Sequence, residues 1–549
     1  MDVVVVGLPG SGKSAIGRRL AARHGASFVD LDLAIERTAG VAIPAIFAAE
    51  GETGFRARER AAIAALGPAD RSPGIVRVIA PGGGAIVDPR NRWQLYRDRR
   101  PIWLDVRSEV LAQRLRRSPT IRPLVGSADP HHVVRELAAG RRRFYAAATR
   151  LNAVAEMRTV VDAADEAARV AASAGTVLLR ADTSIGSIVL GTSIAAGEVD
   201  AALRELGARR AVIVSEPGAW EAVGRALADA VGQLGLTVES VLLPSGEAAK
   251  SLAVVETAAR QLLRLRVERG EPIVAVGGGA LTDVAGFLAA TFLRGIPVIH
   301  VPTTLVGQID AAIGGKTAVD LPEGKNLVGA FHQPAATVID VDLLGTLPQR
   351  ARRGALGEAV KIAALGDERL FTLLEADGPA IATGDPSAAE SGAIAELVER
   401  AAWAKVEVVL ADERESGARI ALNLGHSLAH ALEAAAGYTG LIHGEAVAYG
   451  LRAACRIGVE RGATPPERAA RVERLLDTLD LGSSPLDVPI EAVLAALEAD
   501  KKHRDGHLRW VFPTETGHTV DNAVPDELVR RVAEQVLSGR ASAIAEVGR

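Results

Sequence analysis

A glycine-rich turn containing a lysine and a serine follows an apolar segment near the start of the chain. Residues 2–6 are Asp-Val-Val-Val-Val, and residues 7–14 fit the pattern G-x-x-x-x-G-K-[ST]. Residues 15–23, which come next, have a composition that suits a helix. Glycines at this spacing let backbone N–H groups surround phosphate oxygens at a helix N-terminus. The pattern therefore predicts a buried parallel strand, a P-loop and a helix, which restricts this part of the chain to an α/β fold.

The length and the order of the patterns predict more than one domain. A chain of 549 residues exceeds what one hydrophobic core usually supports. Strand-like and helical patterns alternate to about residue 163, restart near Gly175 and continue to residue 340, after which the sequence is mostly helical. We therefore expect an α/β protein with a P-loop domain at 1–174, a second α/β part at 175–340 and a helical part at 341–549.

The composition excludes several classes of protein. The formal net charge is only -4, which gives no reason to expect nucleic acid or a membrane surface as a partner. A single cysteine, Cys455, rules out an intrachain disulfide and a zinc site made of several thiolates. No apolar run reaches the roughly 18 residues of a membrane span, and the first residues already have a strand pattern, so no signal peptide is expected. We expect a cytoplasmic protein that acts on small molecules.

The P-loop predicts a phosphate donor, and the residues after it suggest an acceptor. Backbone groups of Gly10, Ser11 and Gly12 should hold the phosphates of ATP, while Lys13 reaches the outer phosphates and the Ser14 hydroxyl holds Mg²⁺. Residues 28–32, Phe-Val-Asp-Leu-Asp, bring in two carboxylates. One of these suits Mg²⁺ and the other suits a sugar-like hydroxyl that attacks the phosphoryl group.

Further motifs in this part of the chain are Ile46-Phe47, Gly51-Glu52, Phe55-Arg56, Glu59 and the turn at residues 82–84. This succession, over residues 1–165, resembles the shikimate kinase family, which implies ATP- and Mg²⁺-dependent phosphorylation of shikimate. By matching position, the resemblance assigns shikimate binding to Asp32, Arg56, Gly82, Gly83, Gly84 and Arg141. It implies that Asp32 and Lys13 are catalytic. It also implies that Asp30 acts near the metal and that Arg122 belongs to a lid over ATP. Arg142 and Arg143 are alternatives to Arg141. Another small P-loop kinase, such as a gluconate kinase, is the alternative reading.

A second glycine-rich turn predicts a dinucleotide site. Residues 274–280 form an apolar strand that runs into Gly277-Gly278-Gly279 before a helix. A turn of this kind at a helix start suits a pyrophosphate. The prediction gains weight from Pro-Ser-Gly-Glu-Ala-Ala-Lys at residues 244–250 and Pro-Thr-Thr-Leu at residues 302–305.

The helical part contains a candidate metal site. Glu358 and Lys361 share one helix face, and His426 lies four residues before His430. His443 follows in His-Gly-Glu. Glu358, His426 and His443 make a three-ligand set that leaves zinc an open position for substrate. The protease pattern H-E-x-x-H is absent, so a zinc protease is not expected.

These motifs together resemble 3-dehydroquinate synthase over residues 177–515. The resemblance implies conversion of 3-deoxy-D-arabino-heptulosonate 7-phosphate to 3-dehydroquinate and phosphate, with NAD and Zn²⁺ or Co²⁺ as cofactors. By matching position, it assigns NAD contacts to Glu216, Glu247, Lys250, Gly278, Gly279, Asp283, Thr303 and Thr304. It assigns substrate binding and catalysis to Arg294, Asp310, Lys316, Lys325, Asn326, Lys361, Lys405, Arg419, His430 and one of Lys501 and Lys502. Three departures from the family pattern are Glu216 for Asp, Ala311-Ala312 for Ser-Ser, and Ala429 for Gly.

Taken together, these patterns predict a bifunctional enzyme of the shikimate pathway. A metal-dependent polyol dehydrogenase of the glycerol dehydrogenase type shares the glycine strand and the histidine-rich helical part, but it has no need for Lys316, Lys325, Lys361 and Lys405. Another sugar-phosphate cyclase is a nearer alternative, and a non-enzymatic role would leave both complete residue sets idle. The oligomeric state stays open, and a homodimer formed through the synthase half is compatible with the resemblance.

Overall fold

In a computed structural model, the chain folds into two compact units. The structure describes residues 1–117, 129–152, 157–169, 175–415, 417–438, 440–503 and 508–539, without the side chains of residues 157, 158, 169 and 500–503. The first unit comprises Met1–Thr183 and Ser187–Ile194, and the second comprises Ser184–Gly186 and Ala195–Arg549. The expected α/β class is confirmed. The domain boundaries expected at 174/175 and 340/341 stay predictions.

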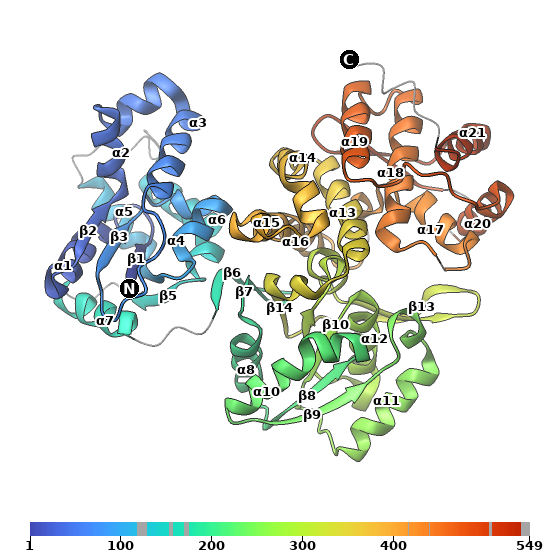
Figure 1. Ribbon diagram of the computed structural model, residues 1–549, viewed down its shortest axis with the longest axis horizontal. Coiled ribbons are helices and arrows are strands. Elements are labelled where there is room, and N and C mark those ends of the chain that lie inside the picture. Colours follow the sequence, from blue (N-terminus) through green and yellow to red (C-terminus); the bar gives the residue numbers. More distant parts are fainter. Residues whose placement is uncertain are drawn as a thin grey trace. The chain divides into compact units, whose positions relative to one another are not determined.

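The first unit contains a five-stranded parallel sheet in the order β2-β3-β1-β4-β5. Its strands are β1 (Asp2–Val6), β2 (Ser27–Asp30), β3 (Arg77–Ala80), β4 (Arg100–Asp105) and β5 (Thr149–Asn152). The four valines of β1 are fully buried because β1 is central and the helices of the unit enclose the sheet (Figure 1). The predicted strand before the P-loop is therefore the middle strand of this sheet.

In this unit, α1 (Lys13–His24) follows β1 after the P-loop and α2 (Leu31–Ala39) follows β2 directly. The other helices are α3 (Ile43–Ala64), α4 (Pro89–Tyr96), α5 (Ser108–Arg116), α6 (Pro130–Tyr145) and α7 (Met157–Arg169), with a 3-10 segment at Ala85–Val87. Helix α3 is interrupted at Gly51, which has φ 67° and ψ -172°. The strand-to-helix connections place α1 and α2 at the carboxyl end of the sheet, where ligands bind in α/β folds.

The α/β part of the second unit is built on parallel strands in the order β14-β11-β10-β8-β9. Its strands are β8 (Arg210–Ser215), β9 (Thr237–Leu242), β10 (Ile273–Gly277), β11 (Val298–Pro302) and β14 (Ala336–Asp340). The preceding strands β6 (Thr176–Thr183) and β7 (Gly186–Thr192) fall, except for Gly186, in the residue ranges of the first unit. The helices are α8 (Ala195–Glu205), α9 (Pro217–Ala219), α10 (Arg225–Gln233), α11 (Leu252–Arg264) and α12 (Gly279–Thr291). Strands β12 (Lys316–Leu321) and β13 (Gly324–Phe331) form an antiparallel hairpin.

The rest of the second unit is mostly helical, as its Ala-, Leu- and Glu-rich sequence predicts. Its helices are α13 (Gln349–Ala364), α14 (Glu368–Thr383), α15 (Pro386–Glu390), α16 (Ala393–Ala411), α17 (His426–Ala435), α18 (His443–Glu460), α19 (Pro466–Thr478), α20 (Ile490–His503) and α21 (Asp526–Leu537). Strands β15 (Trp510–Pro513) and β16 (His518–Asp521) pair antiparallel. Figure 1 shows these helices in yellow to red, packed around α13 and α18.

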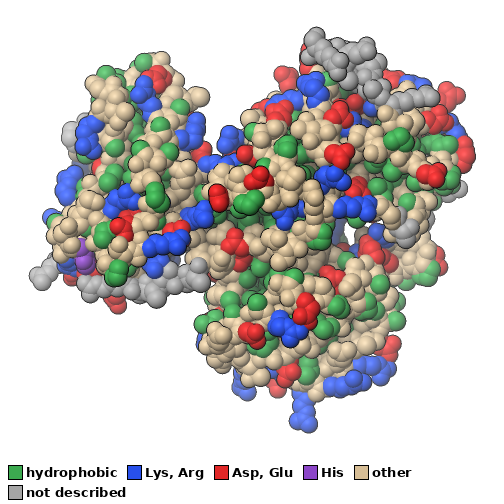
Figure 2. All heavy atoms as spheres, viewed as in Figure 1, with side chains coloured by type: hydrophobic (Ala, Val, Ile, Leu, Met, Phe, Trp, Pro, Cys, Tyr) green, Lys and Arg blue, Asp and Glu red, His purple; other side chains and the backbone are tan. Residues whose placement is uncertain are grey.

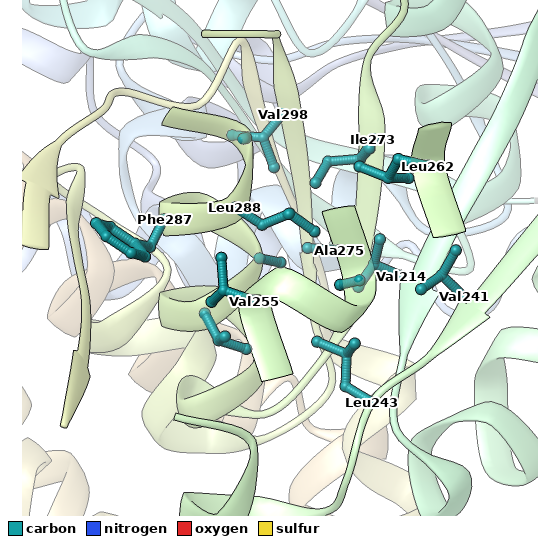
Figure 3. Close-up of a cluster of buried hydrophobic side chains, with 14 of the residues drawn as sticks. Val214, Val241, Leu243, Val255, Leu262, Ile273, Ala275, Phe287, Leu288 and Val298 are labelled. Carbon is teal, nitrogen blue, oxygen red and sulfur yellow. The ribbon is translucent and has the colours of Figure 1, made fainter. Parts of the chain in front are cut away.

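The core of the α/β part lies between the sheet and two helices. Figure 3 shows Val214, Ile273 and Val298 from the strands facing Leu262 of α11 and Leu288 of α12. Burial of these apolar side chains holds α11 and α12 on one face of the sheet. It thereby sets the position of the glycine turn at the start of α12.

The surface offers little that singles out one kind of partner. In Figure 2, basic and acidic side chains are interspersed over the visible face. Among the described helices, none combines the length and the apolar character needed to cross a bilayer.

Leu262 and Leu263 are neighbours in α11 with opposite environments, since Leu262 is 0% exposed and Leu263 is 67% exposed. Leu262→Ala should lower the free energy of unfolding of the second unit by about 2–5 kcal/mol because it leaves a cavity. Leu263→Ala is the matched control and should change it by less than about 0.5 kcal/mol. Denaturant titration followed by tryptophan fluorescence measures both, and equal effects would contradict the packing of α11 described above.

Candidate active sites

The P-loop of the first unit has the backbone conformation of a phosphate cradle. Gly10 and Gly12 have φ values of 84° and 95°, which residues other than glycine rarely adopt. Gly12 is also the N-cap residue of α1. Lys13 Nζ donates to the carbonyl oxygens of Gly7 at 2.9 Å and Leu8 at 3.3 Å, so the lysine lies across the loop. The loop thus gathers backbone donors and an ammonium group around one space.

Two further residues fit a nucleotide with its metal ion. The Ser11 hydroxyl is buried and has no hydrogen-bond partner among the described residues, which suits an additional polar group in the loop. Ser14 lies in the first turn of α1, and Asp30 ends β2 and caps α2 by accepting a hydrogen bond from Leu33 N at 3.4 Å. Serine and aspartate oxygens are ligands that Mg²⁺ prefers. The residues present therefore fit ATP with Mg²⁺.

The predicted acceptor residues meet at the turn of residues 82–84. A methyl group added to Gly82 would lie 2.8 Å from Asp32 Oδ1, and one added to Gly84 would lie 2.9 Å from Arg56 Nη2. The carbonyl oxygen of Gly83 accepts hydrogen bonds from Arg141 Nη1 at 2.9 Å. It also accepts one from the Tyr145 hydroxyl at 2.6 Å. The structure thus brings together Asp32, Arg56, Arg141 and the three glycines.

Buried charges hold the arginine of this pocket. Arg56 pairs with Glu59 at 2.8 Å, and the side chain of Glu59 is only 2% exposed. Burial raises the pKa of the Glu59 carboxyl, although the charge of Arg56 acts in the opposite direction. Glu59 was part of the sequence motif without a role, and the structure shows that it anchors Arg56.

The three consecutive arginines of α6 have different surroundings. Arg141 donates to the 82–84 turn, whereas the Arg142 guanidinium lies 5.7 Å from the ring centre of Trp103 and the Arg143 guanidinium 4.6 Å from that of Phe144. Arg141 is therefore the one that reaches the acceptor residues. Arg122, expected in a lid over ATP, lies outside the described residues.

The second unit brings together the three predicted metal ligands. Candidate ligand atoms of Glu358, His426 and His443 all lie within 4.8 Å of one another. Glu358 Oε1 is 3.4 Å from His426 Nε2 and 3.1 Å from His443 Nε2. Glu358 comes from α13, and the histidines are the first residues of α17 and α18.

The environment of these ligands fits a divalent cation. Glu358 is 1% exposed, and Lys361 Nζ lies 2.5 Å from its Oε2, while the two histidines face its Oε1. The His426 ring is held by its Nδ1, which is 3.1 Å from the Leu424 carbonyl oxygen, so that Nε2 faces Glu358. One carboxylate and two imidazoles match a catalytic zinc site with an open position.

A carboxylate that the sequence motifs did not identify lies behind one metal ligand. Glu433 Oε2 is 3.2 Å from Nδ1 of His443, and Glu433 Oε1 is 3.5 Å from Lys325 Nζ. Burial acts to raise the pKa of Glu433, but the hydrogen bond and the charge of His443 lower it to about 2. Glu433 follows His426 by seven residues, two turns along α17, and this spacing is the signal that could have revealed it.

Four lysines expected around the substrate each pair with a carboxylate. Lys361 pairs with Glu358, and Lys405 Nζ lies 2.6 Å from Asp310 Oδ1. Burial lowers the pKa of Lys405, against the opposing charge of Asp310. The remaining pairs are Lys316 with Glu415 at 2.5 Å and Lys325 with Glu247 at 2.7 Å. These ammonium groups are held in fixed positions without substrate.

The other predicted substrate residues are in varied positions. The His430 ring centre is 5.3 Å from that of His426. Arg419 is 2% exposed and donates to the carbonyl oxygens of Glu413 at 2.6 Å and Gly314 at 3.4 Å. Arg294 is exposed, and no described hydrogen bond or ion pair joins it to the metal-ligand cluster. The side chains of Lys501 and Lys502 are outside the described residues.

The predicted dinucleotide residues lie at the carboxyl ends of three neighbouring strands. Glu216 follows β8, Gly278 follows β10 and caps α12, and Thr303 follows β11. Thr303 N donates to the Gly277 carbonyl oxygen at 2.9 Å. Thr304 Oγ1 accepts from Gly307 N at 3.1 Å. A crevice at this end of a parallel sheet, next to a helix N-terminus, is where a pyrophosphate binds.

Glycine is required at this turn, because a side chain would meet neighbouring residues. A methyl group on Gly278 would come within 3.1 Å of Thr304 Cγ2 and 3.9 Å of Glu216 Oε1, and one on Gly279 would come within 2.9 Å of Ala311 Cβ. Glu216 Oε2 accepts a hydrogen bond from Gly246 N at 2.9 Å, next to Glu247. These residues therefore fit NAD.

A short network joins the crevice to the β12–β13 hairpin. Lys250 Nζ lies 2.7 Å from Asp283 Oδ2 and also donates to Asn326 Oδ1. Burial raises the pKa of Asp283 to about 6, although the charge of Lys250 opposes this. Asn326 has φ 58°, a left-handed conformation that turns its side chain into this network.

The fold and the two sites define a two-part enzyme, with a P-loop kinase unit followed by a unit that binds a dinucleotide and a metal. Residues 9–171 match the family model of shikimate kinase. Residues 240–354 and 355–503 match the models of the N-terminal and C-terminal parts of 3-dehydroquinate synthase. The chain belongs to the 3-dehydroquinate synthase family and carries a shikimate kinase domain in front of it.

Individual relatives agree with this classification. The chain is 42% identical over 328 residues to the 3-dehydroquinate synthase of Thermosynechococcus vestitus, covering 59% of this chain and 88% of the relative. It is 39% identical over 371 residues to that of Jannaschia sp., covering 65% and 98%. A solved structure of 2-epi-5-epi-valiolone synthase from Streptomyces hygroscopicus, with NAD⁺ and Zn²⁺ bound, superimposes with a TM-score of 0.59 at 29% identity, covering 67% of this chain and 99% of that one. The chain is thus a kinase and a cyclase of the lyase type in one polypeptide.

The 82–84 turn offers a test of the kinase geometry. A methyl group on Gly83 would lie 2.9 Å from Pro9 Cδ and 3.2 Å from Pro9 N, so Gly83→Ala should push the turn away from the P-loop. We expect kcat/KM for shikimate phosphorylation to fall by about 10- to 100-fold, because misplaced reacting groups cost this much. Gly140→Ala on α6 meets open space and serves as the control, with kinase kinetics at the wild-type level. Wild-type kinetics in Gly83→Ala would remove the turn from the acceptor site.

Proposed function

We propose that the first unit transfers a phosphoryl group from ATP to shikimate. The second unit is proposed to convert 3-deoxy-D-arabino-heptulosonate 7-phosphate to 3-dehydroquinate and phosphate. The observation that carries the second assignment is the buried cluster of Glu358, His426 and His443 with Lys361 beside it. A metal position next to fixed ammonium groups suits a substrate that offers both hydroxyl oxygens and anionic groups.

In the kinase site, each proposed role follows from the chemistry of the side chain. Asp32 orients the attacking hydroxyl of shikimate and accepts its proton. Arg56 and Arg141 bind the carboxylate of shikimate, since forked guanidinium groups match carboxylates. Lys13 offsets the charge that develops on the transferred group, and Ser14 and Asp30 hold Mg²⁺, which when bound neutralises phosphate charge. We propose that Arg122 belongs to a lid that covers ATP.

Lys13→Ala should lower shikimate phosphorylation by about 100-fold or more, because the ammonium group that offsets phosphoryl charge is lost. The synthase activity of the same protein should stay near the wild-type level, since Lys13 belongs to a unit with its own core. Release of ADP with shikimate and release of phosphate with the seven-carbon sugar acid phosphate measure the two activities. Equal damage to both in a folded variant would contradict two independent units.

In the synthase site, the proposed roles divide between cofactors and substrate. NAD lies against Glu216, Glu247, Lys250, Gly278, Gly279, Asp283, Thr303 and Thr304. When bound, NAD would act as a reversible hydride acceptor. A bound Zn²⁺ or Co²⁺ ion would act as a Lewis acid. Glu358, His426 and His443 hold that ion in place.

The polar residues around the cofactors bind and orient the anionic substrate. Lys316, Lys325, Lys361, Arg294 and Arg419, with Asn326 and His430, are proposed to hold its phosphate, carboxylate and hydroxyl groups, together with Lys501 or Lys502. Lys405 Nζ lies 2.6 Å from Asp310 Oδ1, and burial lowers the pKa of Lys405. This pair is therefore suited to take a proton from a substrate carbon or hydroxyl and to return it.

The main competing function is that of a polyol dehydrogenase, which would release NADH. Lys316, Lys325, Lys361 and Lys405 favour an anionic substrate over a neutral polyol, because a neutral polyol offers their ammonium groups no anionic partner. Another sugar-phosphate cyclase shares all of these features and differs only in the hydroxyl pattern of its substrate.

Chelation of the metal, or His426→Ala, should stop formation of 3-dehydroquinate, because the Lewis acid is lost with its ligand. NAD should be required while no NADH accumulates, since the hydride returns to the same molecule within one turnover. Phosphate release and absorbance at the NADH band measure the two outcomes. Growth of NADH with glycerol, without phosphate release from the sugar acid phosphate, would favour the dehydrogenase instead.

Four further expectations belong to this proposal. We propose domains at 1–174, 175–340 and 341–549, and a homodimer formed through the synthase half, whose β13 carries exposed Leu327 and Phe331. The cytoplasm is the proposed compartment, since the single thiol, Cys455, is buried and has no disulfide partner. Small molecules are the proposed partners, because a net charge of -4 offers nucleic acid little attraction.

A further inference from the structure

Glu433 contacts two functional side chains from different parts of the fold. It lies on α17 with 7% of its side chain exposed. One of its oxygens, Oε2, is 3.2 Å from His443 Nδ1 at the start of α18, and the other, Oε1, is 3.5 Å from Lys325 Nζ on β13. A buried carboxylate that divides its oxygens between two partners restrains both of them.

The two histidine ligands are oriented in different ways. His426 is 11% exposed at its side chain, and its Nδ1 faces the Leu424 carbonyl oxygen of its own chain segment. His443 is 34% exposed at its side chain, so packing alone restrains its ring less. Its Nδ1 faces Glu433, which leaves Nε2 directed at Glu358 Oε1, 3.1 Å away. A carboxylate partner on the far nitrogen sets the tautomer and makes the ring a stronger metal ligand.

Lys325 is held on three sides. Besides Glu433, its Nζ lies 2.7 Å from Glu247 Oε1 and 4.7 Å from the ring centre of Tyr438. Glu247 belongs to the segment that follows β9, near the dinucleotide crevice. Lys325 therefore stands between that crevice and the residue that orients a metal ligand.

We propose that Glu433 is a positioning residue that orients His443 for the metal and holds Lys325 beside it, so that one carboxylate couples metal binding to binding of the anionic substrate. The inference rests on the proposed metal role of Glu358, His426 and His443. Glu433 itself touches neither metal nor substrate in this scheme. Its effect is transmitted through the orientation of its two partners.

Metal affinity of the full-length, NAD-loaded protein provides the direct test. Zn²⁺ affinity measured by competition with a chromophoric chelator should fall by about 10- to 100-fold in Glu433→Ala, as expected for loss of a partner behind a ligand. Glu433→Gln should lose less, because its amide oxygen still accepts the Nδ1 hydrogen of His443. The visible absorption spectrum of the Co²⁺-loaded protein should change in Glu433→Ala, since the ligand geometry changes.

The coupling to Lys325 has its own readout. Glu433→Gln keeps an acceptor for His443 but loses the charge that holds Lys325. In this variant, the fold-increase in KM for the sugar acid phosphate should therefore exceed the fold-decrease in Zn²⁺ affinity. Lys325→Met should raise the same KM and leave Zn²⁺ affinity within about 3-fold of the wild-type value. Loss of metal affinity in Lys325→Met equal to that in Glu433→Ala would overturn the assignment of Glu433 to His443.

Two controls separate this inference from misfolding and from failure of the metal site itself. Glu473 is a buried carboxylate paired with Arg456 at 2.8 Å, away from the ligands, and Glu473→Gln should keep wild-type metal affinity. Shikimate kinase activity in every variant reports the first unit. If His443→Ala keeps full Zn²⁺ affinity, the proposed metal site is wrong. If His443→Ala loses affinity while Glu433→Ala keeps both the affinity and the Co²⁺ spectrum of the wild type, only the role of Glu433 is overturned.

Discussion

The close approach of α13 and α18 is the constraint on which the metal site depends. A methyl group on Gly357 would overlap the carbonyl group of Gly444, and one on Gly444 would overlap that of Gly354. Glu358 and His443 are the direct neighbours of these glycines in the sequence. The two helices can therefore touch backbone to backbone where the ligands leave them, and a side chain at either position would separate the carboxylate from the imidazole.

Ion pairing explains how several charges are tolerated inside the second unit. Glu358, Lys361, Lys405 and Asp310 form pairs in a region where an isolated charge would cost several kcal/mol. Pairing reduces that cost, and a cation bound between Glu358, His426 and His443 would stabilise the buried carboxylate further. The site is thus built to be completed by its metal and its anionic substrate. In the kinase unit a buried ion pair likewise positions a functional side chain, since Glu59 holds Arg56 against the 82–84 turn.

Much of this architecture could be predicted because the signals are local. The strand, glycine turn and helix at residues 2–23 are contiguous, and so are those at residues 273–291, so each pattern contains all the contacts that define it. The candidate ligands Glu358, His426 and His443 could be predicted because each has a motif of its own, although 85 positions separate the first from the last. Glu433 was not predicted, because its spacing from His426 is the one sequence signal that marks it, and its contact with His443 shows the role.

The sequence by itself determined the two α/β units with their glycine turns, the phosphate-binding residues and the types of metal ligand, since these follow from periodicity and spacing along a single segment. Only the tertiary structure decided which of the three consecutive arginines reaches the 82–84 turn and which carboxylate pairs with each lysine. It also shows that Arg294 is exposed and has no described bond to the metal-ligand cluster. These outcomes depend on the rotation and approach of helices whose contacts lie far apart in the chain. Side-chain direction on α6 and the glycine contacts between α13 and α18 are set by packing against other elements, which no local pattern encodes.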